Sequence, residues 1–257
     1  MEKRNHTSTV PMKETFDRLE YRLIDANEKI EASSLENALD NIKGTTVTTG
    51  CGGSLVVADF LTKVLEERGF FCVTQNTRDI IHSKHNMDNL FAYSYSGNTH
   101  GIHLILNQFQ GNKYLLTCNN QKEDAICLGY EEMEKEKSFI SLSSTLIPIG
   151  EFLKYHEKIK KEDFSEKIKL YFQEIKAWLR TLSHQDFLSY GSSEVFEIMT
   201  GYDTEVASYF LESTLVEAGL GNPIIHDKYS YCHGRSTINY QDEKTRSLIY
   251  LINEKTE

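Results

Sequence analysis

The fold of this chain is decided by the stretch Ser94-Tyr95-Ser96-Gly97-Asn98-Thr99. It follows the apolar run 90–93 and precedes the helix-forming run 101–106, so the sequence predicts a strand, a hydroxyl-rich turn and a helix start. The first N–H groups of a helix lack intrahelical partners, and the helix dipole is positive there. Such a turn is a natural phosphate site. The alternative is an ordinary helix N-cap, which also favours Ser, Asn or Thr.

A second strand-turn-helix junction lies at Thr48-Thr49-Gly50-Cys51-Gly52-Gly53-Ser54, before the helical run 55–68. Glycines let the backbone approach a ligand closely, and Ser54 is predicted to lie at the helix start. One β unit, residues 70–75, separates the two junctions. Both turns are therefore expected at the carboxyl edge of one parallel sheet, where open α/β sheets bind ligands.

These two turns resemble those of the sugar isomerase (SIS) domain family. Gly50-Cys51-Gly52-Gly53-Ser54 is similar to the G-x-G-x-S turn after the family's first strand, and 94–99 to its S-x-S-G-x-T turn after the third. The string Ser-Tyr-Ser-Gly-Asn-Thr is similar to the phosphoglucose/phosphomannose isomerase branch. The chain also resembles the double-SIS type, to which the isomerase part of glucosamine-6-phosphate synthase belongs. Residues 139–142 and the following Ser143-Ser144-Thr145 resemble the V-A-S-T segment of the family.

The resemblance implies an α/β fold with a doubly wound parallel sheet, in the flavodoxin-like three-layer αβα arrangement, and a second, shortened SIS-like segment. It also implies a set of residues that hold the phosphosugar. These are Gly52, Gly53, Ser54, Ser94, Tyr95, Ser96, Asn98, Thr99, Ser143 and Ser144.

Two further residues are candidates for catalysis. Glu217 ends the predicted helix 203–218, and His233 follows sixteen residues later. A single Glu on a helix is usually a surface residue and a single His usually a structural one. The resemblance instead implies that Glu217 moves a proton between C1 and C2 of the sugar and that His233 opens the ring. A carboxylate and an imidazole suit these two acid–base steps.

The SIS resemblance leaves three functions open. The first is aldose–ketose isomerisation of a sugar phosphate. The second is a non-catalytic sugar-phosphate sensor whose second segment serves oligomerisation. The third is a deglycase or lyase that acts on a modified sugar phosphate. Thr214 stands where aminating and deglycating relatives often carry Lys, so the sequence does not support amine transfer through a lysine.

The chain divides into four predicted parts: N-terminal helices at 1–44, a first SIS domain at 45–160, a linking helix at 161–190 and a partial second SIS-like domain at 191–257. Strands are predicted at 45–49, 70–75, 89–94, 113–118 and 138–142, and in the last part at 194–199, 223–225 and 247–252. Three strands are few for a doubly wound domain, so the chain is either a shortened relative or a fragment. A three-stranded sheet leaves open edges, which predicts a homodimer.

Composition excludes several other classes. A formal charge of −10 over 257 residues argues against a nucleic-acid partner. Five scattered cysteines predict neither disulfides nor a zinc site. No run approaches the roughly 18 apolar residues of a membrane span, and no export signal is seen, which predicts a cytoplasmic protein without a membrane partner. The pairs His82 with His85 and His100 with His103 lack a third ligand, so neither a metal nor another cofactor is expected.

Overall fold

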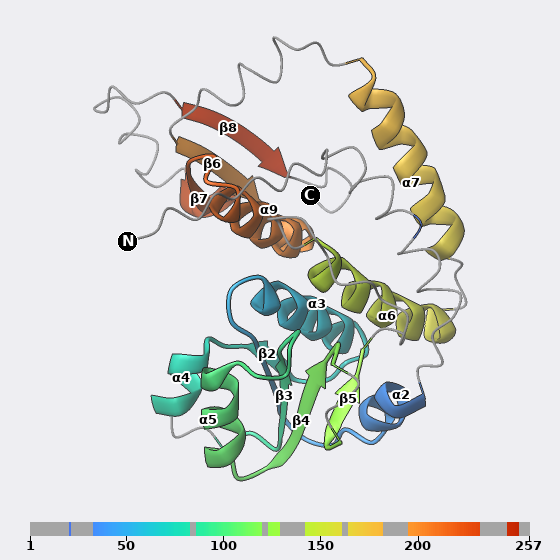
Figure 1. The fold of residues 1–257 in the computed structure, drawn as a ribbon, viewed down its shortest axis with the longest axis vertical. Helices are drawn as coiled ribbons and strands as arrows, with labels where there is room; N and C mark the ends of the chain where they lie inside the picture. Colours follow the sequence, from blue (N-terminus) through green and yellow to red (C-terminus); the bar gives the residue numbers. More distant parts are fainter. Residues whose placement is uncertain are drawn as a thin grey trace, which may run out of the picture. The chain divides into compact units, whose positions relative to one another are not determined.

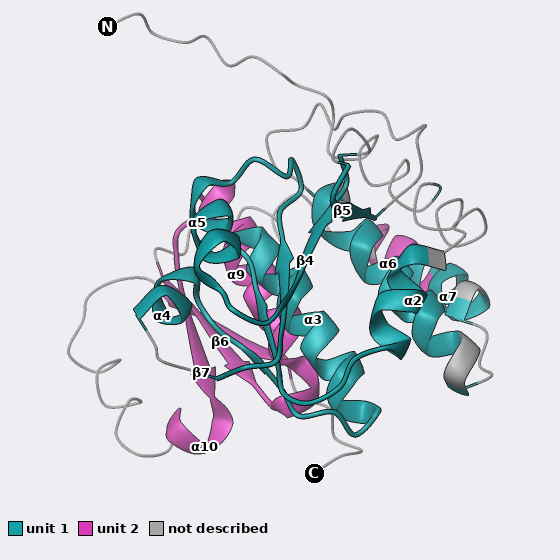
Figure 2. Ribbon diagram, turned by 90° about the horizontal axis from the view of Figure 1, so that it is seen from below, with its two compact units in different colours: residues 1–173 teal, residues 174–257 magenta. Residues whose placement is uncertain are grey.

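The computed structural model describes residues 21, 33–82, 86–119, 123–128, 142–160, 164–181, 195–231 and 246–251. They fall into two compact units, residues 1–173 and 174–257, which are coloured separately in Figure 2. We describe each unit by itself. No helix among the described residues is long and apolar enough to cross a membrane.

The first unit is a five-stranded parallel sheet with helices on both faces (Figure 1). Its strand order is β2-β1-β3-β4-β5. The chain therefore adds β2 on one side of β1 and then places β3, β4 and β5 on the other side. The elements are α2 (Ser33–Asp40), β1 (Thr46–Thr49), α3 (Gly53–Glu67), β2 (Cys72–Thr74), α4 (Thr77–His82), β3 (Asn89–Tyr93), α5 (His100–Gln108), β4 (Asn112–Thr117), β5 (Ala125–Cys127) and α6 (Ser143–Lys160). A further helix, α7 (Phe164–Leu179), crosses from the first unit to the second.

Strand β3 shows why the sheet has helices on both faces. All five of its residues are buried, as expected of a strand that is covered on both sides. Phe91 and Tyr93 belong to a core formed with α2, α3 and α6. Leu90 and Ala92 belong to a second core, which is completed by α4, α5 and Val47 of β1. The predicted three-layer αβα fold is therefore confirmed.

Four of the strands predicted for this unit are present, with ends that differ by one or two residues. The fifth predicted strand, 138–142, lies outside the described residues except for Leu142, which is not in a strand. The fifth strand of the sheet is instead β5, which the sequence analysis missed. Only Ile126 among its three residues is a strong strand former, whereas the equally short β2 directly follows Phe70 and Phe71.

The second unit contains a three-stranded parallel sheet of order β7-β6-β8. The sequence predicts these three strands. Helix α9 packs on one face through Leu215 and Leu211, against Phe196 and Ile198 of the central strand. The elements are β6 (Val195–Thr200), the 3-10 turn η1 (Tyr202–Thr204), α9 (Glu205–Glu217), β7 (Asn222–Asp227), α10 (Lys228–Tyr231) and β8 (Arg246–Leu251).

A buried carboxylate on the central strand of the second unit contacts a side chain on each neighbouring strand. Glu197, on the central strand β6, is only 3% exposed. Its Oε1 lies 2.6 Å from Nη1 of Arg246 on β8, and its Oε2 lies 3.4 Å from Nε2 of His226 on β7. Glu197 thus forms an ion pair with Arg246 of β8 and contacts the imidazole of His226 on β7, in addition to the backbone ladder.

Glu197→Gln should reduce the free energy of unfolding by about 3 kcal/mol, because it keeps the shape of the side chain but removes the buried negative charge that faces Arg246. Chemical denaturation followed by circular dichroism measures this loss. Glu174→Gln, at an exposed carboxylate on α7, is the matched control and should change stability by less than about 0.5 kcal/mol. Equal stabilities of the two variants would contradict this assignment.

Candidate functional site

The turns after β1 and β3 lie next to each other at the carboxyl edge of the first sheet. Thr49, the last residue of β1, is in register with Ala92 of β3, and Tyr93 at the end of β3 is in register with Leu116 of β4. The chain reverses its winding direction between β1 and β3, because β2 lies on the far side of β1. Such a switch point is where open α/β sheets bind ligands.

The turn after β1 is built on glycines. A Cβ atom on Gly50 would lie 2.2 Å from the backbone oxygen of Ser54, so only glycine lets the first turn of α3 come this close. Gly52 caps α3 with φ of 58°, in the region that favours glycine, and no side chain bonds the helix end. Among the described residues, the backbone N–H groups of Gly52 and Gly53 donate to no acceptor. Ser54 is half-buried in the first turn.

The turn after β3 does not have the hydrogen bonding of an ordinary N-cap. Thr99 is the N-cap residue of α5, but its hydroxyl makes no bond to the helix N–H groups. It pairs instead with the buried hydroxyl of Ser94, at an Oγ1–Oγ distance of 2.7 Å. Within the described chain, the N–H groups of Thr99, His100 and Gly101 donate to no protein acceptor. The start of α5 therefore presents free donors.

Three successive carbonyl groups of this turn are already bonded. The oxygen of Tyr95 accepts from the Thr117 hydroxyl at 2.9 Å and from the Cys118 N–H at 3.1 Å. The oxygen of Ser96 accepts from Nδ2 of Asn119 at 3.0 Å, and that of Gly97 bonds Nε2 of His103 at 2.9 Å. Since these acceptors are occupied, the turn offers N–H and hydroxyl donors, which suit an anion.

The end of β2 also lies at this carboxyl edge of the sheet, beside the two turns. The sequence analysis did not predict its contribution. The Thr49 hydroxyl donates to the carbonyl of Gln75 at 2.7 Å. Thr77, the first residue of α4, has its hydroxyl 3.2 Å from the exposed thiol of Cys51. A Cβ atom on Gly101 would lie 3.3 Å from the Thr77 methyl group, so α4 and α5 begin in close contact. Thr77 does not follow a glycine-rich turn. Its position shortly after a predicted strand was the only sequence signal that it could belong to the site.

Ser143 and Ser144 begin helix α6. The carbonyl oxygen of Ser144 accepts a hydrogen bond from the Tyr93 hydroxyl at 2.6 Å, which ties the start of α6 to the end of β3. Burial raises the pKa of Tyr93 well above its ordinary value, so this phenol stays protonated and continues to donate. Asn98 is exposed, and its N–H donates to the Ser96 hydroxyl at 3.2 Å.

Comparison with solved structures finds this fold in proteins that act on phosphorylated sugars. The C-terminal domain of glucosamine-fructose-6-phosphate aminotransferase from Francisella tularensis matches with a TM-score of 0.73 and 11% identity, over 95% of this chain and 76% of that one. Tagatose-6-phosphate ketose/aldose isomerase from Escherichia coli matches with a TM-score of 0.69 and 16% identity, over 93% and 71%. Glucosamine-6-phosphate deaminase from Thermotoga maritima matches with a TM-score of 0.69 and 12% identity, over 95% and 85%.

The chain has the fold of the SIS domain proteins. No model of a known protein family matches the chain, and no curated protein sequence matches it. At these low identities the likeness shows the fold alone. The double-SIS organisation and the predicted domain boundaries stay predictions.

Both residues of the predicted catalytic pair fall within the range of the second unit, 174–257. Glu217 is the last residue of α9, as predicted, and its side chain is exposed. His233 lies outside the described residues, as does His85 of the first histidine pair. The proposed partnership of Glu217 and His233 therefore stays a prediction. Thr214, three residues before Glu217, bonds the carbonyl of Phe210 at 2.7 Å.

The turn after β6 in the second unit has a different chemistry from the turns of the first. The Thr204 hydroxyl accepts the N–H of Gly201 at 3.1 Å and donates to the carbonyl of Leu251. Asp203 adds a carboxylate to the first turn. The Thr204 hydroxyl is occupied and Asp203 adds a negative charge, so this turn is less suited to an anion than the two turns of the first unit.

No group of three or more metal-ligating side chains gathers within the described part of the chain. His103 uses its Nε2 on Gly97. Burial raises the pKa of Cys72 to about 11 and that of Cys118 to about 12, so both thiols stay protonated.

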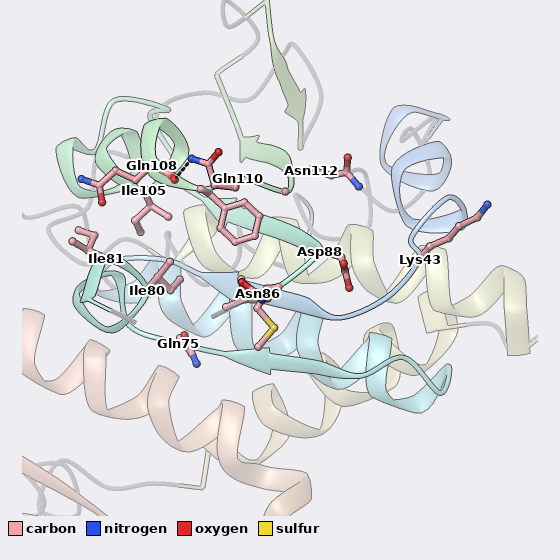
Figure 3. A pocket seen from close by; sticks show the side chains of 14 residues that line it. Lys43, Gln75, Ile80, Ile81, Asn86, Asp88, Ile105, Gln108, Gln110 and Asn112 are labelled. Carbon is pink, nitrogen blue, oxygen red and sulfur yellow. Dashed lines mark hydrogen bonds between the residues drawn. The ribbon is translucent and has the colours of Figure 1, made fainter. Parts of the chain in front are cut away.

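A separate cavity of about 790 Å³ is lined by residues of α4, α5 and the adjoining loops, and none of its lining residues belongs to the turns 50–54 and 94–99. Figure 3 shows its lining side chains. Figure 3 shows Lys43 and Asp88 toward one end and Ile81 toward the other. Asp88 accepts the N–H and hydroxyl of Thr45 at 2.7 and 3.0 Å, and these bonds hold the pKa of its carboxyl below the usual value. With one cation and one carboxylate in its lining, the cavity has no excess of positive charge for a phosphate.

Proposed function

We propose that the turns after β1 and β3 bind the phosphate group of a phosphorylated sugar, and that the protein is an aldose–ketose sugar-phosphate isomerase. One observation carries the phosphate proposal. Two helices begin at the switch point of the sheet with unbonded N–H groups, while the neighbouring carbonyls of the second turn are bonded elsewhere. Neither turn contains Lys or Arg, so helix dipoles and backbone donors would hold the anion.

The named activities of the structural neighbours support the choice of ligand. These neighbours are a glucosamine-fructose-6-phosphate aminotransferase, a tagatose-6-phosphate ketose/aldose isomerase and a glucosamine-6-phosphate deaminase. All three act on sugars phosphorylated at carbon 6, and a phosphate held at the turns would place the other end of such a sugar away from the sheet edge. A fixed phosphate positions the reacting carbons for acid–base chemistry.

The isomerase part of the proposal assigns two roles. Glu217 takes a proton from one sugar carbon and returns it to the neighbouring carbon, while His233 opens the sugar ring. This reaction needs no cofactor, because the aldose and the ketose contain the same atoms and the proton taken from one carbon is returned to its neighbour. We further propose that the working form is a cytoplasmic homodimer.

Two features of the described residues support the homodimer. Each outer strand of the second sheet, β7 and β8, pairs only with β6 among the described strands. Tyr171, Ile175 and Trp178 form an exposed stripe at helical spacing on α7, and Trp178 is 56% exposed. Helical spacing places Ile175 and Phe172 in one apolar stripe of this helix. Phe172 is buried, but Ile175 is 41% exposed.

The first prediction from this function concerns the phosphate. Ser96→Ala and Thr99→Ala should each weaken the binding of glucose 6-phosphate or fructose 6-phosphate by about 1 to 3 kcal/mol, because the anion loses a donor. Titration calorimetry measures the change, and Ser34→Ala on α2, also at an exposed serine, is the control. Unchanged affinity of the first two variants for a ligand that binds the parent protein would refute the phosphate site.

A second prediction concerns the base. Glu217→Gln should lower turnover of phosphorylated glucose, mannose or fructose by about 10² to 10⁴ while substrate still binds, because the amide lacks basicity. His233→Ala should lose less activity on open-chain substrate, since only ring opening is affected. Glu212→Gln, on the same helix, is the matched control.

Solvent deuterium provides the direct readout of that base. It should enter C1 or C2 during turnover by the parent protein and by the Glu212→Gln control. Undiminished incorporation by Glu217→Gln rules out Glu217 as the base. A parent protein that binds a phosphosugar but turns none over favours the sensor function, whereas turnover only of amino-sugar conjugates favours a deglycase or lyase.

A third prediction concerns assembly. Light scattering at micromolar concentration should give at least the dimer mass. Trp178 is the single tryptophan of the chain, so its emission should shift to longer wavelength on dilution if the α7 stripe lies in the interface. A monomer mass at micromolar concentration would contradict the homodimer, and a dimer with an unchanged Trp178 spectrum would place the interface elsewhere.

A further inference from the structure

His103 makes a defined contact with the turn after β3. It lies in the first half of α5, and its Nε2 is 2.9 Å from the carbonyl oxygen of Gly97. A carbonyl oxygen only accepts hydrogen bonds, so Nε2 carries the hydrogen and donates it. Gly97 is buried and has φ of 66°, a conformation that favours glycine. The imidazole thus fixes a residue whose backbone is otherwise unusually free.

One peptide group links the His103–Gly97 hydrogen bond to the side chain of Ser96. The peptide that joins Gly97 to Asn98 is planar and trans, so its C=O and N–H groups point in opposite directions. With the carbonyl bonded to His103, the N–H of Asn98 is directed to Oγ of Ser96, at 3.2 Å. The Ser96 oxygen accepts this bond, and its own hydrogen is the part of the hydroxyl that remains for a ligand.

We propose that His103 is a positioning residue that orients the Ser96 hydroxyl toward the bound phosphate through the Gly97–Asn98 peptide. This inference rests on the proposed phosphosugar function. Orienting a donor before the ligand arrives strengthens binding, because less conformational freedom is lost on binding. It also gives His103 a role different from that of a metal ligand, since the nitrogen involved already serves the carbonyl of Gly97.

The test is a double-mutant cycle with fructose 6-phosphate as the probe, measured by titration calorimetry. His103→Leu removes the donor, and should weaken binding about three- to tenfold, the range expected for one lost hydrogen bond. In a Ser96→Ala background the same change should have little effect, because the hydroxyl that His103 orients is gone. A general structural defect would instead weaken binding by the same factor in both backgrounds.

A rescue experiment separates the loss of the hydrogen-bond donor at position 103 from the loss of side-chain volume there. In Gln the amide nitrogen is as many bonds from Cβ as Nε2 is in His, so His103→Gln should retain affinity close to that of the parent. The amide of His103→Asn is one bond shorter and should not restore binding. Melting temperatures identify any variant that fails to fold, and the Asn and Gln pair remains a test if His103→Leu is unstable.

An independent readout needs no ligand. The Asn98 amide signal in a nitrogen–proton NMR spectrum should shift in Ser96→Ala and in His103→Leu but not in His103→Gln. Equal losses in both backgrounds, or failure of Gln to rescue, would overturn the positioning role while leaving the phosphate site intact. A parent protein that binds no sugar phosphate would overturn the proposed function, and this inference with it.

Discussion

The unbonded N–H groups at the starts of α3 and α5 are the constraint on which this account depends. Every helix begins with donors that its own backbone cannot satisfy, and most helices satisfy them with a side chain or with water. Here the two N-cap residues, Gly52 and Thr99, provide no such side-chain bond. The strand order brings both helix starts to one edge of the sheet, where donors from two elements can converge on one ligand.

Local geometry also explains how a chain of formal charge −10 can hold an anion. Backbone donors and helix dipoles act over the first helical turn, whereas the overall charge acts at longer range and is screened by salt. Bonds from Thr117, Asn119 and His103 occupy the carbonyl oxygens that would otherwise repel a phosphate. The turn after β6 lacks this arrangement, because the hydroxyl of Thr204 is bonded and Asp203 lies in its first turn.

Much of the first unit was predictable from the sequence, because β1 and β3 are short runs of β-branched or apolar residues followed directly by glycine or hydroxyl residues. The same rule failed at β5, in which only Ile126 is a strong strand former, and at Thr77, which begins a six-residue helix without a glycine before it. The contact between His103 and Gly97 was not predictable either. It depends on a positive φ at Gly97 and on a side-chain direction that spacing alone does not specify. Glu217 and His233 are sixteen residues apart, and no periodicity relates them in space.

The most direct test of the central claim is a crystal structure of the protein grown with fructose 6-phosphate. The account predicts that the phosphate oxygens lie within hydrogen-bonding distance of the His100 and Gly101 N–H groups and of the Ser96 hydroxyl, with the sugar extending away from the sheet edge. A phosphate found instead beside Lys43 in the cavity lined by residues of α4 and α5, or bound nowhere at the turns after β1 and β3, would contradict it.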